Sequence, residues 1–238
     1  MHLSTREQHA LARVFALLAE GHAPRPLRLA LGEALLDLLQ ADHFASFVWD
    51  GERGVFQDGV WLNMDAANLA AYDAWFQHHD PITLKLQACR HATEVSEVMP
   101  YDALRRTAFF NDFLARDGLH WGINLHAFEG DHALGDLRIW RGRQRVGFDA
   151  HDKALLDLVE PAFVAALARQ RADDTAARLS PRERAVALAL RRGLTDKQIA
   201  RELDLAVTSV RTYLVRLQQK TGAQRRAGIA AWASRLED

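Results

Sequence analysis

Cysteine is almost absent from this chain of 238 residues, in which Cys89 is the single one. One thiol forms no disulfide within a chain and cannot supply the paired ligands of a cysteine-based zinc site. A fold held together by disulfides is therefore excluded. The composition favours a reducing compartment.

Long apolar runs are missing as well. The first twenty residues include Arg6, Glu7, Arg13 and Glu20, which interrupt the apolar core that a secretory signal requires. No later stretch has the length of a membrane span. We therefore expect a cytoplasmic protein that has no membrane partner.

Acidic side chains are distributed unevenly, and residues 205–236 contain none. Residues 175–238 hold 13 basic and 6 acidic residues, a net charge of +7, whereas residues 1–174 hold 17 basic and 25 acidic residues, a net charge of -8. A basic tail behind an acidic front part indicates that the tail binds nucleic acid.

The front part alternates between helical and extended patterns. Ser4-Thr5-Arg6-Glu7 has the spacing of a capping box and predicts the start of a helix. Aromatic and β-branched residues predict two hairpins, and apolar periodicity predicts helices before, between and after them. The strands are expected over 43–49, 55–61, 119–128 and 133–140, and the later helices over 65–79, 81–89, 101–115 and 149–170. This order predicts an α+β fold, an α/β/α sandwich with one antiparallel sheet.

The chain is expected to divide into a sensor and dimerisation domain (1–170), a linker (171–178) and an all-α helix-turn-helix domain (179–238). The linker is predicted because residues 171–178 are polar and include no large apolar side chain.

Two capping boxes in the tail predict closely spaced helices. Ser180-Pro181-Arg182-Glu183 places a capping serine before a first-turn proline, and Thr195-Asp196-Lys197-Gln198 repeats the pattern after Gly193. A third helix is predicted over 207–221 and ends at Gly222.

The third helix has two different faces. Val210, Leu214 and Leu217 recur at spacings of four and three, which places them on one apolar side. The opposite side carries Thr208, Arg211, Thr212 and Val215. A helix that is held by its apolar side and exposes arginine and threonine is suited to the DNA major groove.

Residues 179–233 resemble the DNA-binding domain of LuxR-type regulators. The matching positions are Glu183, Ile199, Ala200, Leu203, Val210, Lys220 and Gly222. The resemblance implies that Arg211, Thr212 and Val215 face base edges, and that Ser209, Arg216 and Lys220 reach phosphates. Ala206 stands where the family usually has a capping serine, at a cost of about 1 kcal/mol, and Tyr213 stands where histidine is common.

The front part is similar to the GAF-like or PAS-like sensor domains of such regulators, on the strength of residues 109–125 (FFNDFLARDGLHWGINL) and 148–167. It also resembles the acyl-homoserine-lactone receptors through Phe76, Asp80-Pro81 and Gly122. However, Ala67 and Ala71 replace the tryptophan and tyrosine that hold the lactone in those receptors. A lactone would therefore leave buried polar groups unpaired, at about 1–3 kcal/mol each.

Four side chains are candidates for a ligand pocket, namely Trp61, Tyr72, Trp75 and Asp80. The three aromatic residues have core packing as an alternative role. Asp80 has an alternative role as a helix cap before Pro81.

The sequence lacks the motifs that are typical of metal sites, enzymes and phosphorelay receivers. His78-His79-Asp80 is not predicted to bind metal, because neighbouring residues on a helix point in different directions. The chain has no phosphate-binding glycine loop, nucleophile elbow or HExxH motif, so we predict neither an enzyme nor a cofactor. A phosphorelay receiver is not predicted, since the chain opens with two helices.

These observations predict a sequence-specific, DNA-binding transcriptional regulator that acts as a homodimer. Its expected partners are double-stranded DNA and a small-molecule ligand. Two alternatives stay open: a quorum-sensing receptor for acyl-homoserine lactones, and a ligand-independent regulator whose front domain binds another protein.

Overall fold

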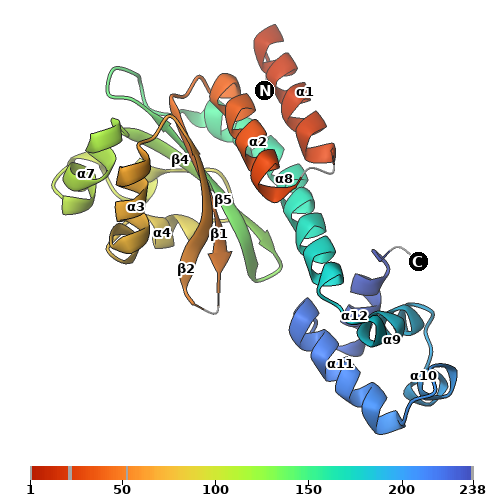
Figure 1. Ribbon diagram of the computed structural model, residues 1–238. Helices are drawn as coiled ribbons and strands as arrows, with labels where there is room; N and C mark the ends of the chain where they lie inside the picture. The colour runs from red at the N-terminus through yellow and green to blue at the C-terminus, as the bar shows by residue number, and fades with distance from the viewer. Residues whose placement is uncertain (1, 21–22, 52, 237–238) are drawn as a thin grey trace. The chain divides into compact units, whose positions relative to one another are not determined.

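The computed structural model describes residues 2–20, 23–51 and 53–236, which form two compact units. The first unit extends to Ala168 and the second begins at Arg169 (Figure 1). Within the described residues, no helix is both long and apolar enough to cross a bilayer.

The first unit is built on an antiparallel sheet of five strands in the order β2-β1-β5-β4-β3. The strands are β1 (His43–Asp50), β2 (Val55–Leu62), β3 (Thr93–Glu94), β4 (Trp121–Glu129) and β5 (His132–Arg141). The four predicted strands are confirmed. β3 was not predicted, because two residues are too few to show an alternating pattern.

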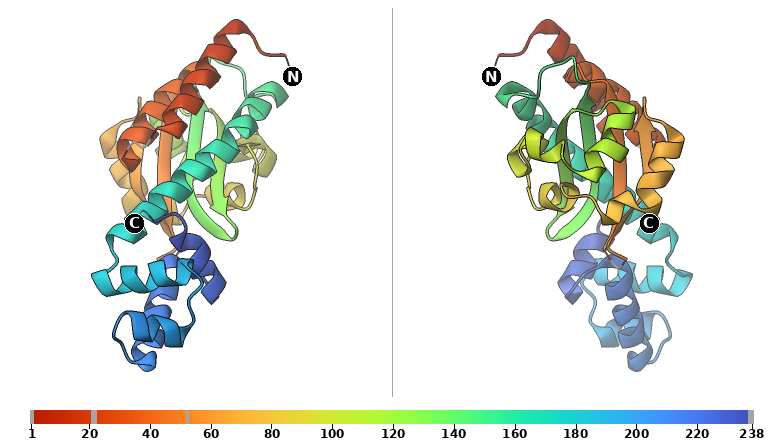
Figure 2. Two further views of the ribbon diagram at one scale, coloured as in Figure 1. Left: turned by 90° about the vertical axis from the view of Figure 1, so that its right-hand side faces the viewer. Right: turned by 90° about the vertical axis from the view of Figure 1, so that its left-hand side faces the viewer.

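One face of the sheet is covered by long helices. α2 (Pro24–Leu38) and α8 (Ala150–Ala177) lie against it, and α1 (Thr5–Ala19) packs on α2 (Figure 2). The capping box at Ser4 and Glu7 is confirmed at the start of α1. Leucine side chains of these helices fill this layer together with Ile123 and Ile139 of the sheet.

The other face is covered by short helices: α3 (Ala66–Ala74), α4 (Thr83–Gln87), α5 (Val95–Val98), α6 (Tyr101–Leu104) and α7 (Ala108–Asp112), with 3-10 turns η1 (Phe76–His78) and η2 (Leu114–Asp117). A second core of mainly aromatic side chains lies beneath them. The sheet thus has helices on both faces, and the predicted α/β/α sandwich is confirmed.

α8 is longer than the sequence predicts. It continues through residues 171–177, which were expected to be a linker. These residues include neither glycine nor proline, and alanine and arginine favour helix. Polarity alone therefore did not mark a break in the helix.

The second unit contains α9 (Pro181–Arg191), α10 (Asp196–Glu202), α11 (Val207–Thr221) and α12 (Arg226–Ala233). Both predicted capping boxes are present, and Gly222 ends α11 in the left-handed conformation with a φ of 72°. The helices share a core that includes Val186, Ile199, Val210, Leu217 and Ile229.

Candidate functional site

α11 presents one buried face and one exposed face. Val210 and Leu217 are fully buried, and Leu214 is half-buried against the same core. The residues predicted to meet DNA are exposed, apart from a half-buried Ser209, and they are Thr208, Ser209, Arg211, Thr212, Val215, Arg216 and Lys220. The helix therefore carries the two faces that the sequence predicts.

Arg211 lies beside an acidic residue of the neighbouring helix. Its Nε is 3.7 Å from Oδ2 of Asp196, the first residue of α10, and the Arg211 side chain is 72% exposed. Arg226 pairs with the same carboxylate. Asp196 thus holds two cations at the start of α10 without burying either of them.

Lys220 is tied into the domain itself. Its Nζ donates to Oε2 of Glu183 at 2.7 Å and to the carbonyl of Arg178 at 3.1 Å. Burial raises the pKa of Glu183, but hydrogen bonds from Lys220 and Ser180 outweigh burial and hold this pKa below its usual value. Lys220 therefore neutralises a buried carboxylate of the fold, in addition to the phosphate contact predicted for it.

Two further residues of α11 make local contacts. Thr212 donates its hydroxyl to the carbonyl of Thr208, one turn earlier, at 3.1 Å. The guanidinium of Arg216 lies over the ring of Tyr213, 5.9 Å from its centroid. Ala206 caps the helix without a side-chain hydrogen bond, as predicted from its lack of a hydroxyl.

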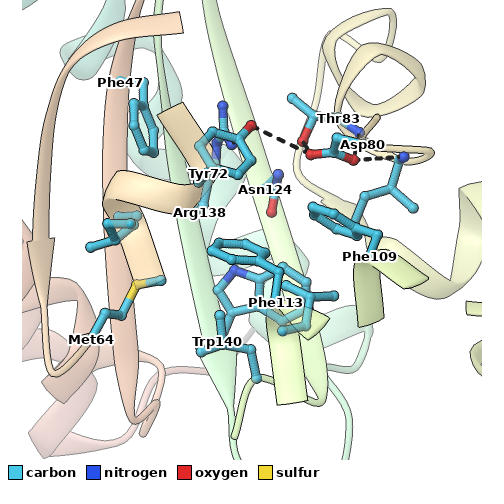
Figure 3. A pocket seen from close by; sticks show the side chains of 15 residues that line it. Phe47, Met64, Tyr72, Asp80, Thr83, Phe109, Phe113, Asn124, Arg138 and Trp140 are labelled. Carbon is cyan, nitrogen blue, oxygen red and sulfur yellow. Dashed lines mark hydrogen bonds between the residues drawn. The ribbon is translucent and has the colours of Figure 1, made fainter. Parts of the chain in front are cut away.

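A small cavity lies in the first unit between the sheet and the short helices (Figure 3). Its volume of about 20 Å³ has room for roughly one or two water molecules. Aromatic and aliphatic side chains make up most of its wall: Ala45, Phe47, Met64, Leu69, Tyr72, Ile82, Phe109, Phe113, Leu114, Leu119 and Trp140. The polar lining residues are Asp80, Thr83, Asn124 and Arg138.

Asn124 and Arg138 form the polar floor of this cavity. They are direct partners in the ladder between β4 and β5, and Arg138 is also paired with Ala45 of β1. Paired residues of antiparallel strands point to the same face of a sheet. The small side chain of Ala45 leaves space beside the guanidinium.

Arg138 is buried in a hydrogen-bonded network. Its Nε donates to Oδ2 of Asp136 at 2.9 Å, and its Nη1 donates to the hydroxyl of Tyr72 at 2.7 Å. The guanidinium also lies 4.5 Å and 4.4 Å from the ring centroids of Phe47 and Phe56. Burial lowers the pKa of Arg138, but Asp136 and Tyr72 more than compensate and raise it.

Tyr72 links Arg138 to Asp80. Its hydroxyl accepts from Arg138 and donates to Oδ2 of Asp80 at 3.4 Å (Figure 3). Burial raises the pKa of Tyr72 to about 12, so the phenol stays protonated at neutral pH.

Asp80 shapes the chain before α4. Its Oδ1 accepts from the backbone N–H groups of Ile82 and Thr83, and its Oδ2 accepts from the Thr83 hydroxyl as well as from Tyr72. These bonds hold the turn that leads into α4, but the N-cap position of that helix is Ile82 and has no side-chain cap, so the capping role given above as the alternative for Asp80 stays a prediction. All four contacts use acceptor positions that a ligand would otherwise need.

The four predicted ligand residues separate in the structure. Tyr72 and Asp80 line the cavity, whereas Trp61 and Trp75 do not. Trp75 is 49% exposed and stacks on His79 with ring centroids 3.8 Å apart. Trp61 is half-buried and packs against the aromatic core, the alternative role considered for it.

Gly122 sets the position of a lining side chain without touching the cavity. A Cβ at this residue would lie 2.7 Å from the indole of Trp140 and 2.7 Å from a methyl group of Val95. Only a glycine lets the indole rest against the strand here.

Among the described residues, no group of three or more metal-ligating side chains occurs, and His78, His79 and Asp80 form no such site.

Residues 177–233 match the sequence profile of the luxR family of bacterial regulatory proteins. The second unit is a luxR-family domain. The resemblance noted in the sequence is thus confirmed, and this luxR-family domain identifies the chain as a DNA-binding regulator. No sequence among the curated proteins matches this chain.

Solved structures share this fold, two of them over nearly the whole chain and one over about two thirds of it. SdiA from Escherichia coli is 18% identical with a TM-score of 0.55, covering 97% of this chain and 98% of SdiA. A structure of SdiA in complex with octanoyl-rac-glycerol is 15% identical with a TM-score of 0.56, covering 99% and 97%. CepR2 from Burkholderia cenocepacia, described as an N-acylhomoserine lactone dependent LuxR family transcription factor, is 17% identical with a TM-score of 0.50, covering 68% and 93%.

The GAF-like character of the first unit also has a structural counterpart. The GAF domain of an Acinetobacter phosphoenolpyruvate-protein phosphotransferase is 8% identical with a TM-score of 0.51, covering 75% of this chain and 99% of that domain. At these identities the likeness concerns the fold. The predicted GAF-like architecture is confirmed.

Proposed function

We propose that this chain is a cytoplasmic, homodimeric transcriptional regulator that binds a specific DNA sequence through α11 and is controlled through its first unit. The observation that carries the proposal is the exposed cationic side of α11 in a luxR-family domain. The net charge of +7 over residues 175–238 supports it, because cationic surfaces attract the phosphate backbone.

Control by a small molecule is supported by the cavity in the first unit. Its wall is apolar with a few convergent polar groups, which is typical of ligand sites. SdiA holds octanoyl-rac-glycerol, and CepR2 is described as lactone-dependent. A ligand would act here only to the extent that it binds one state of the protein more tightly than the other. Asp80 is already saturated, and Ala67 and Ala71 supply no donors, so an acyl-homoserine lactone is the less favoured ligand.

A second candidate function is favoured by the small volume of the cavity. A cavity of about 20 Å³ has little space for a ligand unless side chains move. A ligand-independent regulator whose first unit binds another protein would need no larger space. Failure of every tested compound to stabilise the protein would favour this second function.

DNA recognition is tested by substituting Arg211. We expect Arg211→Ala to weaken binding to a selected operator by about 1–3 kcal/mol and to leave binding to random duplex nearly unchanged, because a base contact discriminates between sequences. Fluorescence anisotropy with both duplexes measures the difference. Arg106→Ala, an exposed arginine of the first unit, is the matched control for the loss of one charge. Equal losses on the two duplexes would remove Arg211 from base recognition.

A further inference from the structure

One polar group of the cavity has unused hydrogen-bonding capacity. Asn124 is 2% exposed, lines the cavity, and its Oδ1 has no hydrogen-bond partner among the described residues. Buried amides are rarely left unpaired in native proteins, because the unmade hydrogen bond destabilises the fold. Figure 3 shows this side chain between Tyr72, Phe113 and Asp80.

The neighbouring polar groups cannot satisfy Asn124. Oδ1 of Asn124 needs a donor, whereas the Asp80 carboxylate only accepts hydrogen bonds and the Tyr72 hydroxyl donates its one hydrogen to Asp80. Nη2 of Arg138 lies 2.7 Å from Oδ2 of Asp136 as an ion pair, yet it has no partner in hydrogen-bond geometry. Asn124 and Arg138 therefore offer, side by side, an amide oxygen without a partner and a guanidinium nitrogen whose contact with Asp136 lacks hydrogen-bond geometry.

The charge around this pair disfavours an anionic ligand. The one cation of the lining, Arg138, is already paired with the fully buried Asp136 behind the wall, and Asp80 places a carboxylate in the cavity itself. A further carboxylate would be desolvated with no free positive charge to compensate it. A neutral group that both donates and accepts hydrogen bonds suits the floor better.

The apolar wall indicates the rest of the ligand. Phe47, Phe109, Phe113 and Trp140 surround a narrow space, and most lining residues are buried; Met64 and Asp80 are the half-buried ones. Flat rings pack well between aromatic side chains. Met64 is a flexible side chain that can make room.

Resting on the proposed function, we infer that the cavity binds a compact aromatic compound whose neutral amide or hydroxyl group pairs with Asn124 beside Arg138. In the free protein, one or two water molecules fit the same space and can meet the same two groups. The ligand replaces this water and, after Met64 and neighbouring side chains move to enlarge the space of about 20 Å³, adds the contacts of its ring to the aromatic wall.

The experiment compares benzamide with benzoate on the full-length protein, because the two probes share a shape and differ in charge. Thermal unfolding is followed during titration at millimolar concentrations. We expect benzamide to raise the Tm in a saturable manner, and benzoate to raise it less or not at all. Octanoyl-rac-glycerol is titrated in parallel as a ligand with a long flexible chain.

Asn124→Leu keeps the size of the side chain and removes its amide. We expect this variant to bind benzamide about tenfold more weakly, while its own Tm without ligand stays equal to or above that of the wild type. A merely structural role for Asn124 would instead lower the Tm. Thr93→Val is the matched control, because Thr93 is the partner of Asn124 in the next strand and does not line the cavity.

Three results would overturn the inference: no shift with benzamide, a shift with benzoate of equal size, or unchanged benzamide affinity in Asn124→Leu. Stabilisation by octanoyl-rac-glycerol alone would also overturn it and would leave the proposed ligand control standing. The two probes decide the question on the wild-type protein even if Asn124→Leu does not fold. DNA binding is scored independently by the Arg211 experiment.

Discussion

His126 carries its imidazole into the interior beside a buried carboxylate. It is the ladder partner of Asp136 and is 3% exposed, with no hydrogen-bond partner for Nε2 among the described residues. Burial lowers the pKa of His126 to about 4; Asp136 opposes this shift and Arg138 adds to it. The folded protein therefore keeps this imidazole neutral where an unfolded chain would protonate it.

The pH dependence of stability follows from this shift. Above pH 6.5, the ordinary pKa, His126 is neutral in both states and has no effect. As the pH falls below that value, only the unfolded state takes up the proton, so the free energy of unfolding decreases, by about 2 kcal/mol between pH 6.5 and about 5. We expect His126→Gln to remove this part of the dependence. Urea unfolding followed by tryptophan fluorescence measures it, and identical slopes in both proteins would contradict the assignment.

Lys220 has a structural role that can be separated from DNA binding. Lys220→Met leaves the Glu183 carboxylate, 4% exposed, without its cation, and we expect a loss of about 2 kcal/mol in the stability of the second unit, moderated by the partial exposure of Lys220. Glu183→Gln in the same chain should restore part of it. A double-mutant cycle by calorimetry measures the coupling. Additive effects of the two substitutions would show that the pair contributes nothing.

The sequence revealed some residues of the cavity and concealed others. Asp80 was found through the Asp80-Pro81 pair of the receptor pattern, and Tyr72 because it is a nearby aromatic residue that can substitute for those missing at Ala67 and Ala71. Asn124 and Arg138 were not found, because each stands on a different strand and only the register of β4 with β5 brings them together. The signal in the sequence was weak: Asn124 is a polar residue between Ile123 and Leu125, and His126 of the same strand shows the same pattern without lining the cavity.

At the scale of elements, the N-terminus of α11 lacks a side-chain cap, which one hydroxyl group can supply. Ala206 has the backbone conformation of a capping residue, φ -68° and ψ 146°, but no side-chain acceptor. We expect Ala206→Ser to stabilise the second unit by about 1 kcal/mol, and Ser180→Ala in the capping box of α9 to destabilise it by a similar amount. Calorimetry of the unfolding transition of the second unit measures both changes in stability. A serine variant no more stable than the wild type would show that solvent already satisfies this end of the helix.

Helix starts were predicted better than helix ends. The capping residues Ser4, Ser180 and Thr195 each bond to a residue three positions later, so the local sequence is enough to predict them. All three capping boxes are present. The helix predicted to reach His79 ends at Ala74 and continues as a 3-10 turn. Proline indicated a stop near residue 80, whereas tertiary packing of Phe76 into the aromatic core decides where the helix ends.

At the scale of the whole molecule, charge and cores are divided between two units. Each unit has its own buried core, and the opposite net charges of residues 1–174 and 175–238 follow nearly the same division. DNA affinity is therefore assigned to the second unit. A single unit of this kind gains affinity when two copies are joined.

The proposed homodimer predicts a dependence on operator geometry. We expect the full chain to bind a duplex with two half-sites about 10²-fold more tightly than a duplex with one. Inserting about five base pairs between the half-sites should abolish this gain, because it turns the second half-site to the other side of the helix. Anisotropy titrations on the three duplexes measure the effect. Equal affinity for one and two half-sites would exclude cooperative binding by a dimer.

Gly122, which packs against Trp140, is a position outside the cavity at which a substitution could change the ligand preference proposed for it. Any side chain at position 122 would have to displace the indole of Trp140 or the methyl group of Val95, since a Cβ there would lie 2.7 Å from each. Under the proposed function, the size limit for ligands would therefore depend on a residue that does not line the cavity. A search for determinants of selectivity confined to contact residues would overlook it.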